Sequence, residues 1–181
     1  MSDQIDVLKL VGGRLDEAGI PYMVSGSMAM NFYAQPRMTR DIDLVVDLEP
    51  RDATRVAEAF IADFYCDAEA IRSAIARRGF FNLIHFDKLI KVDFIVRRES
   101  AFRRVEFDRR RRVVVDGASL WMVTAEDLLL SKLAWARDSR SPVQLGDVRN
   151  LMQSADTIDW PYVERWAAEL AVVDLLGEMR Q

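Results

Sequence analysis

Apolar residues recur along the chain at two spacings, one typical of helices and one typical of strands. Near the start, Ile5, Leu8 and Leu15 follow a helical spacing that ends at Gly19-Ile20-Pro21, which predicts a first amphipathic helix. Further helical patterns cover 28–33, 51–62 and 68–77. Short apolar runs with a strand pattern lie at 22–25, 41–46, 80–86 and 89–96. The first half of the chain therefore predicts a small mixed sheet with helices packed against it.

The short connections between these runs restrict the topology. Only Asp87-Lys88 separates the strand patterns at 80–86 and 89–96, and a two-residue connection makes two strands antiparallel neighbours. The turn Asp116-Gly117 separates two more short strands in the same way, at 113–115 and 120–123. We expect two hairpins in the sheet.

Helical patterns dominate from Thr124 onward. Thr124 can cap a helix whose first turn carries Glu126 and Asp127, as the helix dipole favours. Three more helical segments follow at 146–153, 161–170 and 172–180. We therefore expect an α+β fold in which residues 1–123 form a mixed-sheet core with flanking helices. Residues 124–181 would form a helical C-terminal part, with a cleft between the two.

The composition excludes several classes of protein. Half of the 181 residues are hydrophobic and 30% are charged, which is typical of a globular protein. No apolar run approaches the roughly 18 to 20 residues that span a bilayer, and the amino terminus is acidic where a signal peptide is basic. We expect a cytoplasmic protein with no membrane partner. The single Cys66 and single His85 exclude an internal disulfide and a histidine-rich zinc site, so we expect a small core cysteine and a packed or surface histidine.

The net charge of −4 hides a basic segment. From Arg97 to Arg112 the chain has eight arginines and three acidic residues, a net charge of +5 that leaves −9 for the rest. Clustered arginines can bind the phosphates of RNA or of a nucleotide. They can equally form a solvated surface, and only Phe102 and Phe107 add aromatic rings to the segment. Both interpretations stay open at this point.

Three aspartates interrupt the predicted strands. Asp41 and Asp43 are two residues apart at the start of one strand, so both carboxylates project from the same face. Asp93 interrupts the apolar run 89–96. Carboxylates at the edge of a hydrophobic sheet are costly to desolvate without a cation, and Mg²⁺ prefers such hard oxygen ligands. The alternative is that they are ordinary strand-end residues.

A glycine turn precedes these aspartates. Gly26-Ser27 follows the strand at 22–25 and opens the helix at 28–33. Strand, glycine turn and helix together direct backbone N–H groups outward at the helix start, where phosphate binds well. Taken alone, such a turn is common and has no specific function.

Together these residues resemble the nucleotidyltransferases of the DNA polymerase beta superfamily. The signature of that superfamily is a Gly-Ser or Gly-Gly turn, an Asp-x-Asp pair and a third acidic residue on a later strand. The segments 23–27, 37–43, 124–133 and 146–148 are similar to the AbiEii-type (type IV toxin) branch, and the likeness spans roughly residues 20 to 153. The run 137–142 departs from the Arg-Asp-x-x-Asp-like pattern frequent in that branch, which affects the assignment of Asp147.

The resemblance implies a role for each matching residue. It implies that the sheet is the nucleotidyltransferase core, that Asp41 and Asp43 hold two Mg²⁺ ions, and that Asp93 helps to hold one ion and accepts a proton. Gly26 and Ser27 would contact the triphosphate of an NTP. The remaining candidates for nucleotide binding are Lys132, which would reach the β- or γ-phosphate, together with Lys91, Arg40, Arg137 and Asp147. Without the resemblance, a lysine such as Lys132 is more often a surface residue that extends along an apolar helix.

The resemblance also implies a function. The expected reaction is Mg²⁺-dependent transfer of NMP from an NTP to an acceptor hydroxyl, on RNA if the arginines between Arg97 and Arg112 contact nucleic acid. A second hypothesis is an antibiotic-type enzyme that modifies a small molecule. A third is a catalytically idle module that binds a nucleotide or a partner, such as an antitoxin protein in a toxin-antitoxin pair. The sequence does not identify the acceptor or the preferred base.

Overall fold

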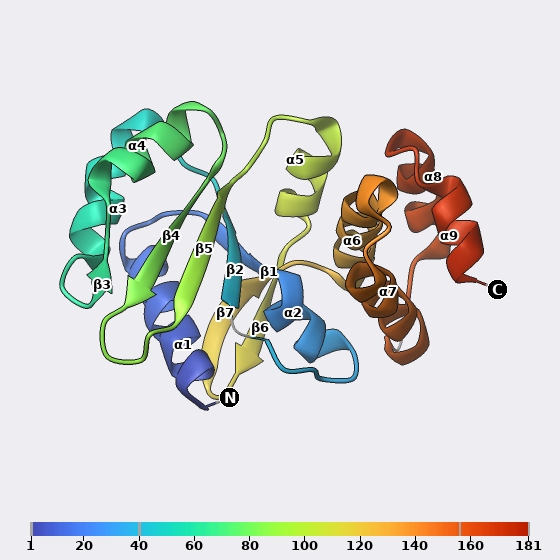
Figure 1. Ribbon diagram of the computed structural model, residues 1–181, viewed down its shortest axis with the longest axis horizontal. Coiled ribbons are helices and arrows are strands. Elements are labelled where there is room, and N and C mark those ends of the chain that lie inside the picture. The colour runs from blue at the N-terminus through green and yellow to red at the C-terminus, as the bar shows by residue number, and fades with distance from the viewer. Residues whose placement is uncertain (1, 40, 156, 181) are drawn as a thin grey trace.

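The structure is a computed structural model that describes residues 2–39, 41–155 and 157–180. The described residues form a seven-stranded mixed sheet with helices against it and a helical group at the C-terminal end (Figure 1). The strands are β1 (Tyr22–Ser25), β2 (Asp41–Val46), β3 (Phe64–Tyr65), β4 (Phe80–His85), β5 (Lys91–Val96), β6 (Arg111–Val115) and β7 (Ala118–Met122). The helices are α1 (Ser2–Glu17), α2 (Gly26–Tyr33), α3 (Ala53–Phe60), α4 (Ala68–Ala76), α5 (Ala101–Asp108), α6 (Ala125–Ser139), α7 (Pro142–Ser154), α8 (Trp160–Glu169) and α9 (Val173–Met179), with a 3-10 turn η1 (Pro50–Asp52). The α+β fold expected from the sequence is confirmed.

The strand order is β3-β4-β5-β2-β1-β7-β6. Strand β2 lies at the centre, parallel to β5 and antiparallel to β1. The two outer hairpins, β4 with β5 and β6 with β7, are antiparallel as the sequence predicted. The parallel contact between β2 and β5 requires a long crossover, which η1, α3, β3, α4 and β4 provide.

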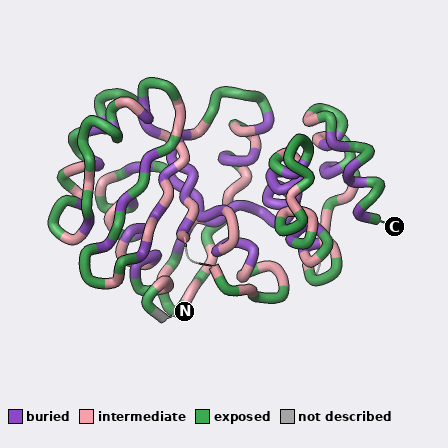
Figure 2. The backbone as a smooth tube through the Cα atoms, in the orientation of Figure 1, coloured by how far each residue is buried: buried purple, intermediate pink, exposed green. Residues whose placement is uncertain are grey.

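The buried core extends from α1 through the sheet to α6 and the helices that follow it. Alternate residues of β4 and β5 are buried, among them Phe81 and Phe94, whose rings stack with centroids 4.9 Å apart. Phe60 of α3 meets Phe94 edge-on at 5.7 Å, so α3 covers this face of the sheet. Buried segments run through the strands and α6, while the outer helices and loops are mostly exposed (Figure 2). The apolar alternation in the sequence therefore gives β4 and β5 one packed face, whereas all four residues of β1 are buried.

The hairpin between β4 and β5 differs from its prediction. The last register pair is Ile84 with Lys91, so the connection is longer than Asp87-Lys88. His85 explains the difference, because its buried ring packs against Phe64 and its Nδ1 accepts hydrogen bonds from the backbone N–H groups of Asp87 and Lys88. The histidine is packed, as expected, and it organises the turn. Cys66 is partly buried against the core.

Two elements were not predicted. Helix α5 lies inside the arginine-rich segment, where Ser100 caps it by accepting a hydrogen bond from the backbone N–H of Arg103. Its buried Phe102 and Phe107 pack the helix against the core. The sequence did not indicate this helix, because arginines surround the two phenylalanines. The short strand β3 was not predicted either, since a strand of two residues shows no alternation of apolar and polar positions. Helix α7 begins at its Pro142, earlier than Gly146, because proline is favoured in the first turn of a helix.

The C-terminal helices follow the predicted order. Thr124 caps α6 by accepting a hydrogen bond from the backbone N–H of Asp127, as the sequence indicated. Helix α6 contacts α2, α7, α8 and α9, so it joins the helical group to the sheet. None of the helices in the described part of the chain is long and apolar enough to cross a membrane.

Candidate active site

A row of polar residues crosses the centre of the sheet. Ser25 of β1 is the register partner of Asp43 on β2, Asp43 is the partner of Asp93 on β5, and Asp93 is the partner of Asn82 on β4. Register partners project from the same face, so these four side chains lie in line. Asp41 precedes Asp43 by two residues and shares that face. The pairing of β2 with β5 thus brings the three aspartates together.

Lys91 lies among these carboxylates. Its Nζ is 2.9 Å from Oδ2 of Asp93 and 3.5 Å from Oδ2 of Asp41, its register partner. Burial raises the pKa of Asp43, and the nearby charge of Asp93 raises it further. The backbone N–H of Ser27 and the ammonium of Lys132 act in the opposite direction. The cluster therefore holds more negative charge than Lys91 alone can compensate.

Gly26 is required by the position of Asp43. Its φ is +57°, a left-handed conformation that glycine adopts at little cost. A Cβ at this position would lie 2.6 Å from Cγ of Asp43 and 2.8 Å from its Cβ. The glycine turn therefore makes room for an aspartate side chain, a neighbour that sequence reasoning did not identify.

Lys132 is not the surface lysine that the alternative interpretation described. Its side chain is 5% exposed and its Nζ donates a hydrogen bond of 2.7 Å to Oδ2 of Asp147 on α7. Gln144 Oε1 lies 3.3 Å from the same nitrogen. The lysine is thus held in place between α6 and α7, with its charge directed by a buried carboxylate.

Arg37 completes this network, a role that was not predicted from the sequence. Its Nε and Nη2 donate hydrogen bonds of 2.9 Å to the two oxygens of Asp147, and Nη2 also donates to Ser27 Oγ at 2.7 Å. Asn31 fixes the Arg37 backbone by bonding both its N–H and its carbonyl oxygen. Burial alone would raise the pKa of Asp147, but the hydrogen bonds from Arg37 and Lys132 outweigh it, and the pKa is lowered.

The sequence contains only part of the information that identifies Arg37 as a site residue. The residue lies in the segment 37–43 that carries the family resemblance, but its ionic partner is 110 positions away. Nothing in the local pattern distinguishes it from the neighbouring Arg40.

Arg137 and Arg40 were also predicted to bind the nucleotide. Arg137 pairs with Asp138 and donates a hydrogen bond to the carbonyl oxygen of Leu170. Arg40, a predicted nucleotide contact, lies outside the described residues. Over 2–39, 41–155 and 157–180, no group of three or more His, Cys, Asp or Glu side chains is arranged to hold a metal ion.

Most arginines of the segment 97–112 have partners inside the protein. Arg103 bonds both oxygens of buried Glu106, and Arg109 bonds Asp127 while its guanidinium lies 3.8 Å from the centre of the Tyr162 ring. Further contacts join Arg97 to Asp47, Arg110 to the rings of Phe107 and Trp121, and Arg112 to Asp16. The segment therefore links α5 and β6 to the rest of the fold.

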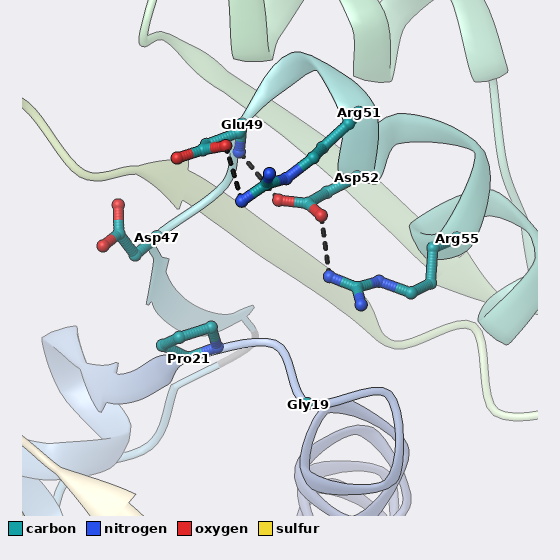
Figure 3. Close-up of a pocket in the computed structure, with 7 residues that line it drawn as sticks. All are labelled: Gly19, Pro21, Asp47, Glu49, Arg51, Asp52 and Arg55. Carbon is teal, nitrogen blue, oxygen red and sulfur yellow. Dashed lines mark hydrogen bonds and ion pairs between the residues drawn. The ribbon is translucent and has the colours of Figure 1, made fainter.

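A polar cavity lies at the other end of β2. It measures about 530 Å³ and is lined by Gly19, Pro21, Asp47, Glu49, Arg51, Asp52 and Arg55 (Figure 3). Asp47 follows the end of β2, whereas Asp41 and Asp43 lie at its start. The two arginines are already paired, Arg51 with Glu49 and Arg55 with Asp52. The aspartate row is thus separate from this cavity.

Comparison with known proteins identifies the fold. No family model and no curated protein matches the chain. The solved structure of the antibiotic-resistance factor ANT(2'')-Ia has a TM-score of 0.60 at 13% identity, over 99% of this chain and 97% of that one. An antigenic nucleotidyltransferase-like protein from Paracoccidioides brasiliensis gives 0.59 at 17%, over 82% and 73%. The lincosamide antibiotic adenylyltransferase LnuA, with lincomycin bound, gives 0.51 at 12%, over 78% and 91%. The chain therefore has the fold of nucleotidyltransferases.

Proposed function

We propose that this protein is an enzyme that transfers a nucleotidyl group from an NTP to an acceptor hydroxyl. The observation that carries the proposal is the register of β2 with β5, because it aligns Asp43 with Asp93 beside the Gly26-Ser27 turn. The fold shared with nucleotidyltransferases supports the same reaction class.

The reaction requires a base and a stable leaving group. The acceptor oxygen attacks the α-phosphorus of the NTP and forms a new P–O bond, while the bond from that phosphorus to the bridging oxygen breaks. Pyrophosphate leaves, and the hydroxyl proton passes to the Asp93 carboxylate. Asp93 suits this role because its side chain is 20% exposed and lies next to Asp43 in the aspartate row.

The chemistry of the three aspartates suits a divalent cation, although their side chains, as placed around Lys91, are not arranged to hold one. They offer the hard oxygen ligands that Mg²⁺ prefers, and burial of Asp43 beside Asp93 creates a demand for positive charge. Asp41, Asp43 and Asp93 would hold two Mg²⁺ ions, and Lys91 would move away from them. When bound, such ions neutralise charge on the reacting and leaving phosphates.

The cations beside Ser27 form the nucleotide side of the site. Asp147 holds Lys132 and Arg37 in fixed positions, and Arg37 contacts the Ser27 hydroxyl at the start of α2. One carboxylate for two cations leaves a net positive charge next to a helix N-terminus, which favours a triphosphate. Lys91 and Arg40 remain weaker candidates for phosphate binding, whereas Arg137 is engaged with Asp138.

The identity of the acceptor distinguishes the remaining hypotheses about the function. An AbiEii-like enzyme stays our first hypothesis, with a cytoplasmic location, an antitoxin as a partner, and RNA as the acceptor if arginines between Arg97 and Arg112 contact nucleic acid. The likeness to ANT(2'')-Ia, also solved with adenylyl-2''-tobramycin, and to LnuA favours the antibiotic-type alternative. A catalytically idle binding module is the third.

One experiment tests the reaction. The purified protein is incubated with radiolabelled NTPs, Mg²⁺ and cell extract, and the labelled product is identified. We expect the parent to label one acceptor and Asp41→Ala to label none. Equal labelling by the two proteins would contradict the proposal. Calorimetry that detects Mg²⁺-dependent NTP binding without transfer would support the idle module.

A further inference from the structure

An exposed tryptophan lies one helical turn beyond Lys132 on α6. Trp135 is 71% exposed, although the preceding residues from Leu128 to Leu133 are all buried. Leu128 and Trp135 are seven positions apart, which is close to two helical turns, so their side chains leave α6 on the same side. Leu128 is packed at the lower end of this side, whereas the ring of Trp135 is open to solvent further along the helix.

The residues one turn earlier show where the Trp135 side chain points. The Ser131 hydroxyl donates a hydrogen bond to Glu106 of α5, and the Lys132 ammonium donates one to Asp147 of α7. With 3.6 residues per turn, the direction of Trp135 falls about 40° from that of Ser131 and about 60° from that of Lys132, between the two. Figure 1 shows α5 to the left of α6, with α7 beside α6. Trp135 therefore projects between α5 and α7, next to the cations of the nucleotide side.

Helix α7 carries a second exposed apolar residue close to this place. Val143 is 57% exposed and precedes Asp147 by four positions, so the two lie on the same face of α7 one turn apart. Only residues 140–141 separate α6 from α7, which makes the helices antiparallel neighbours. Trp135 comes after Lys132 on α6, and Val143 comes before Asp147 on α7. Both apolar side chains are therefore displaced from the ion pair in the same direction, toward the connection between the helices.

Trp135 differs from the other tryptophans in having an uncovered ring. Arginine guanidinium groups lie over the rings of Trp121 and Trp160, and the ring of Trp166 packs against Phe102. In the part of the chain that the structure describes, no cation or aromatic ring covers Trp135 in this way. Most of its indole surface is available to a ligand.

The order of charged and apolar groups on this side of the cleft matches the order within an NTP. Lys132 and Arg37 would hold the triphosphate beside Ser27, and the base is the uncharged planar part of the same molecule. Side chains three apart on a helix are neighbours, with Cβ atoms about 5–6 Å apart, so a base linked to a triphosphate at Lys132 lies within reach of Trp135. The acceptor hydroxyl, in contrast, has to meet Asp93 on β5, two strands away from β1.

We propose that Trp135 is the aromatic ring on which the base of the NTP stacks, with Val143 as its apolar neighbour. The inference rests on the proposed function, because it assigns a residue to the nucleotide of that reaction. Every nucleobase offers a π-face, so stacking on an indole contributes affinity without strong selection among bases. The role of Trp135 is thus to hold the nucleoside while the cations hold the phosphates.

Two ligands separate the contribution of the base from that of the phosphates. Calorimetry with Mg²⁺ measures the Kd of α,β-methylene ATP, which cannot be cleaved at the α-phosphate, and of inorganic tripolyphosphate, which has no base. We expect Trp135→Ala to weaken binding of the ATP analogue about 5- to 150-fold and to leave the Kd of tripolyphosphate unchanged. Trp135→Phe keeps an aromatic ring and should bind the analogue nearly as well as the parent.

The matched control is an exposed apolar residue on the other side of the sheet. Ile61 is 64% exposed at the end of α3, whose Phe60 packs on Phe94. Residues 93 and 94 point to opposite faces of β5, so α3 lies on the face away from the aspartates. Ile61→Ala should bind both ligands as the parent does.

Tryptophan fluorescence gives a second readout, which reports the contact itself. The ATP analogue should quench the emission of the parent, and tripolyphosphate should not. The quenching should disappear in Trp135→Phe, although this variant still binds the analogue and retains the other three tryptophans.

The inference is overturned if Trp135→Ala binds the ATP analogue as tightly as the parent. An equal loss of affinity for both ligands would also overturn it, because the change would then act on the phosphate side. If the parent bound neither ligand, the proposed function would fail together with the inference. If binding of the analogue depended on Trp135 but no nucleotidyl transfer were detected, only the proposed reaction would be contradicted.

Discussion

Asp43 of β2 and Asp93 of β5 are register partners on neighbouring parallel strands. Their side chains therefore leave the sheet on one face, with backbones about 4.8 Å apart. Burial raises the pKa of Asp43, and repulsion from the Asp93 carboxylate raises it further. The pair is stable where a cation is near, which links the geometry to the proposed chemistry.

Asp93→Asn should abolish transfer but leave the fold intact. The substitution keeps the shape of the side chain and removes both a proton acceptor and a ligand charge, so we expect kcat to fall at least about 100-fold. Steady-state kinetics and calorimetry with NTP and Mg²⁺ measure the effect. Asp87→Asn, at an exposed position in the turn after β4, should have normal kinetics. A normal rate in Asp93→Asn would remove Asp93 from the reaction.

Gly26→Ala should damage both stability and activity. An L-residue at φ +57° costs about 1–2 kcal/mol, and the added Cβ would displace the Asp43 carboxylate. Urea denaturation and a transfer assay measure the two losses. Gly13→Ala is the control, because its Cβ meets nothing within 4 Å and alanine in a helix should stabilise it by about 1 kcal/mol. Similar behaviour of the two variants would be inconsistent with the role of Gly26.

Asp147→Asn should destabilise the junction of α6 and α7. It leaves the buried Lys132 ammonium without its anionic partner, a change that costs about 3–5 kcal/mol in comparable buried pairs. The free energy of unfolding in urea measures the loss, and the KM for NTP should rise because Lys132 and Arg37 lose their fixed positions. Asp138→Asn removes the exposed partner of Arg137 and should change neither quantity. An unchanged KM in Asp147→Asn would argue against the network.

Glu106→Gln should change the pH dependence of stability. Burial raises the pKa of Glu106 above the ordinary 4.5, against the opposing effect of Arg103 and Ser131. A raised carboxyl pKa means that the folded state holds a proton that the unfolded state has lost, so this group makes stability fall as pH rises from 4.5 to the folded pKa. Above that pKa its contribution is constant.

The glutamine variant lacks this titration. As pH rises from 4.5, the unfolding free energy of the parent should therefore fall relative to that of Glu106→Gln. The difference between the two should then level off. Urea denaturation across this range measures it, with Glu58→Gln at an exposed position of α3 as the control. A difference that does not vary with pH would contradict the prediction.

Arg109→Lys should weaken the fold rather than a nucleic-acid contact. Lysine cannot reproduce the guanidinium that bonds Asp127 and lies over the Tyr162 ring, so we expect a loss of about 1–2 kcal/mol in unfolding free energy. Arg104→Lys, at an exposed position of α5, should be neutral. Unchanged stability in Arg109→Lys together with weaker, less salt-dependent RNA binding would restore the phosphate-binding interpretation.

Local patterns in the sequence predicted most of the elements. Alternation predicted the strands that carry the aspartates, and Thr124 was correctly identified as a helix cap. Helix α5 was missed because its two buried phenylalanines lie among arginines, whose partners cannot be inferred from charge alone. The longer turn at 86–90 was missed because it depends on the His85 ring, a side chain contact with no signature in spacing.

The sequence by itself determined that Asp41 and Asp43 share a face, because a strand has a period of two residues. Only the tertiary structure decided that Asp93 stands beside them, since that depends on the register of two strands separated by a long crossover. The same is true of Arg37 and Asp147, which are 110 positions apart. Spacing specifies which neighbours a residue has along its own element, whereas packing of the core sets how the elements meet.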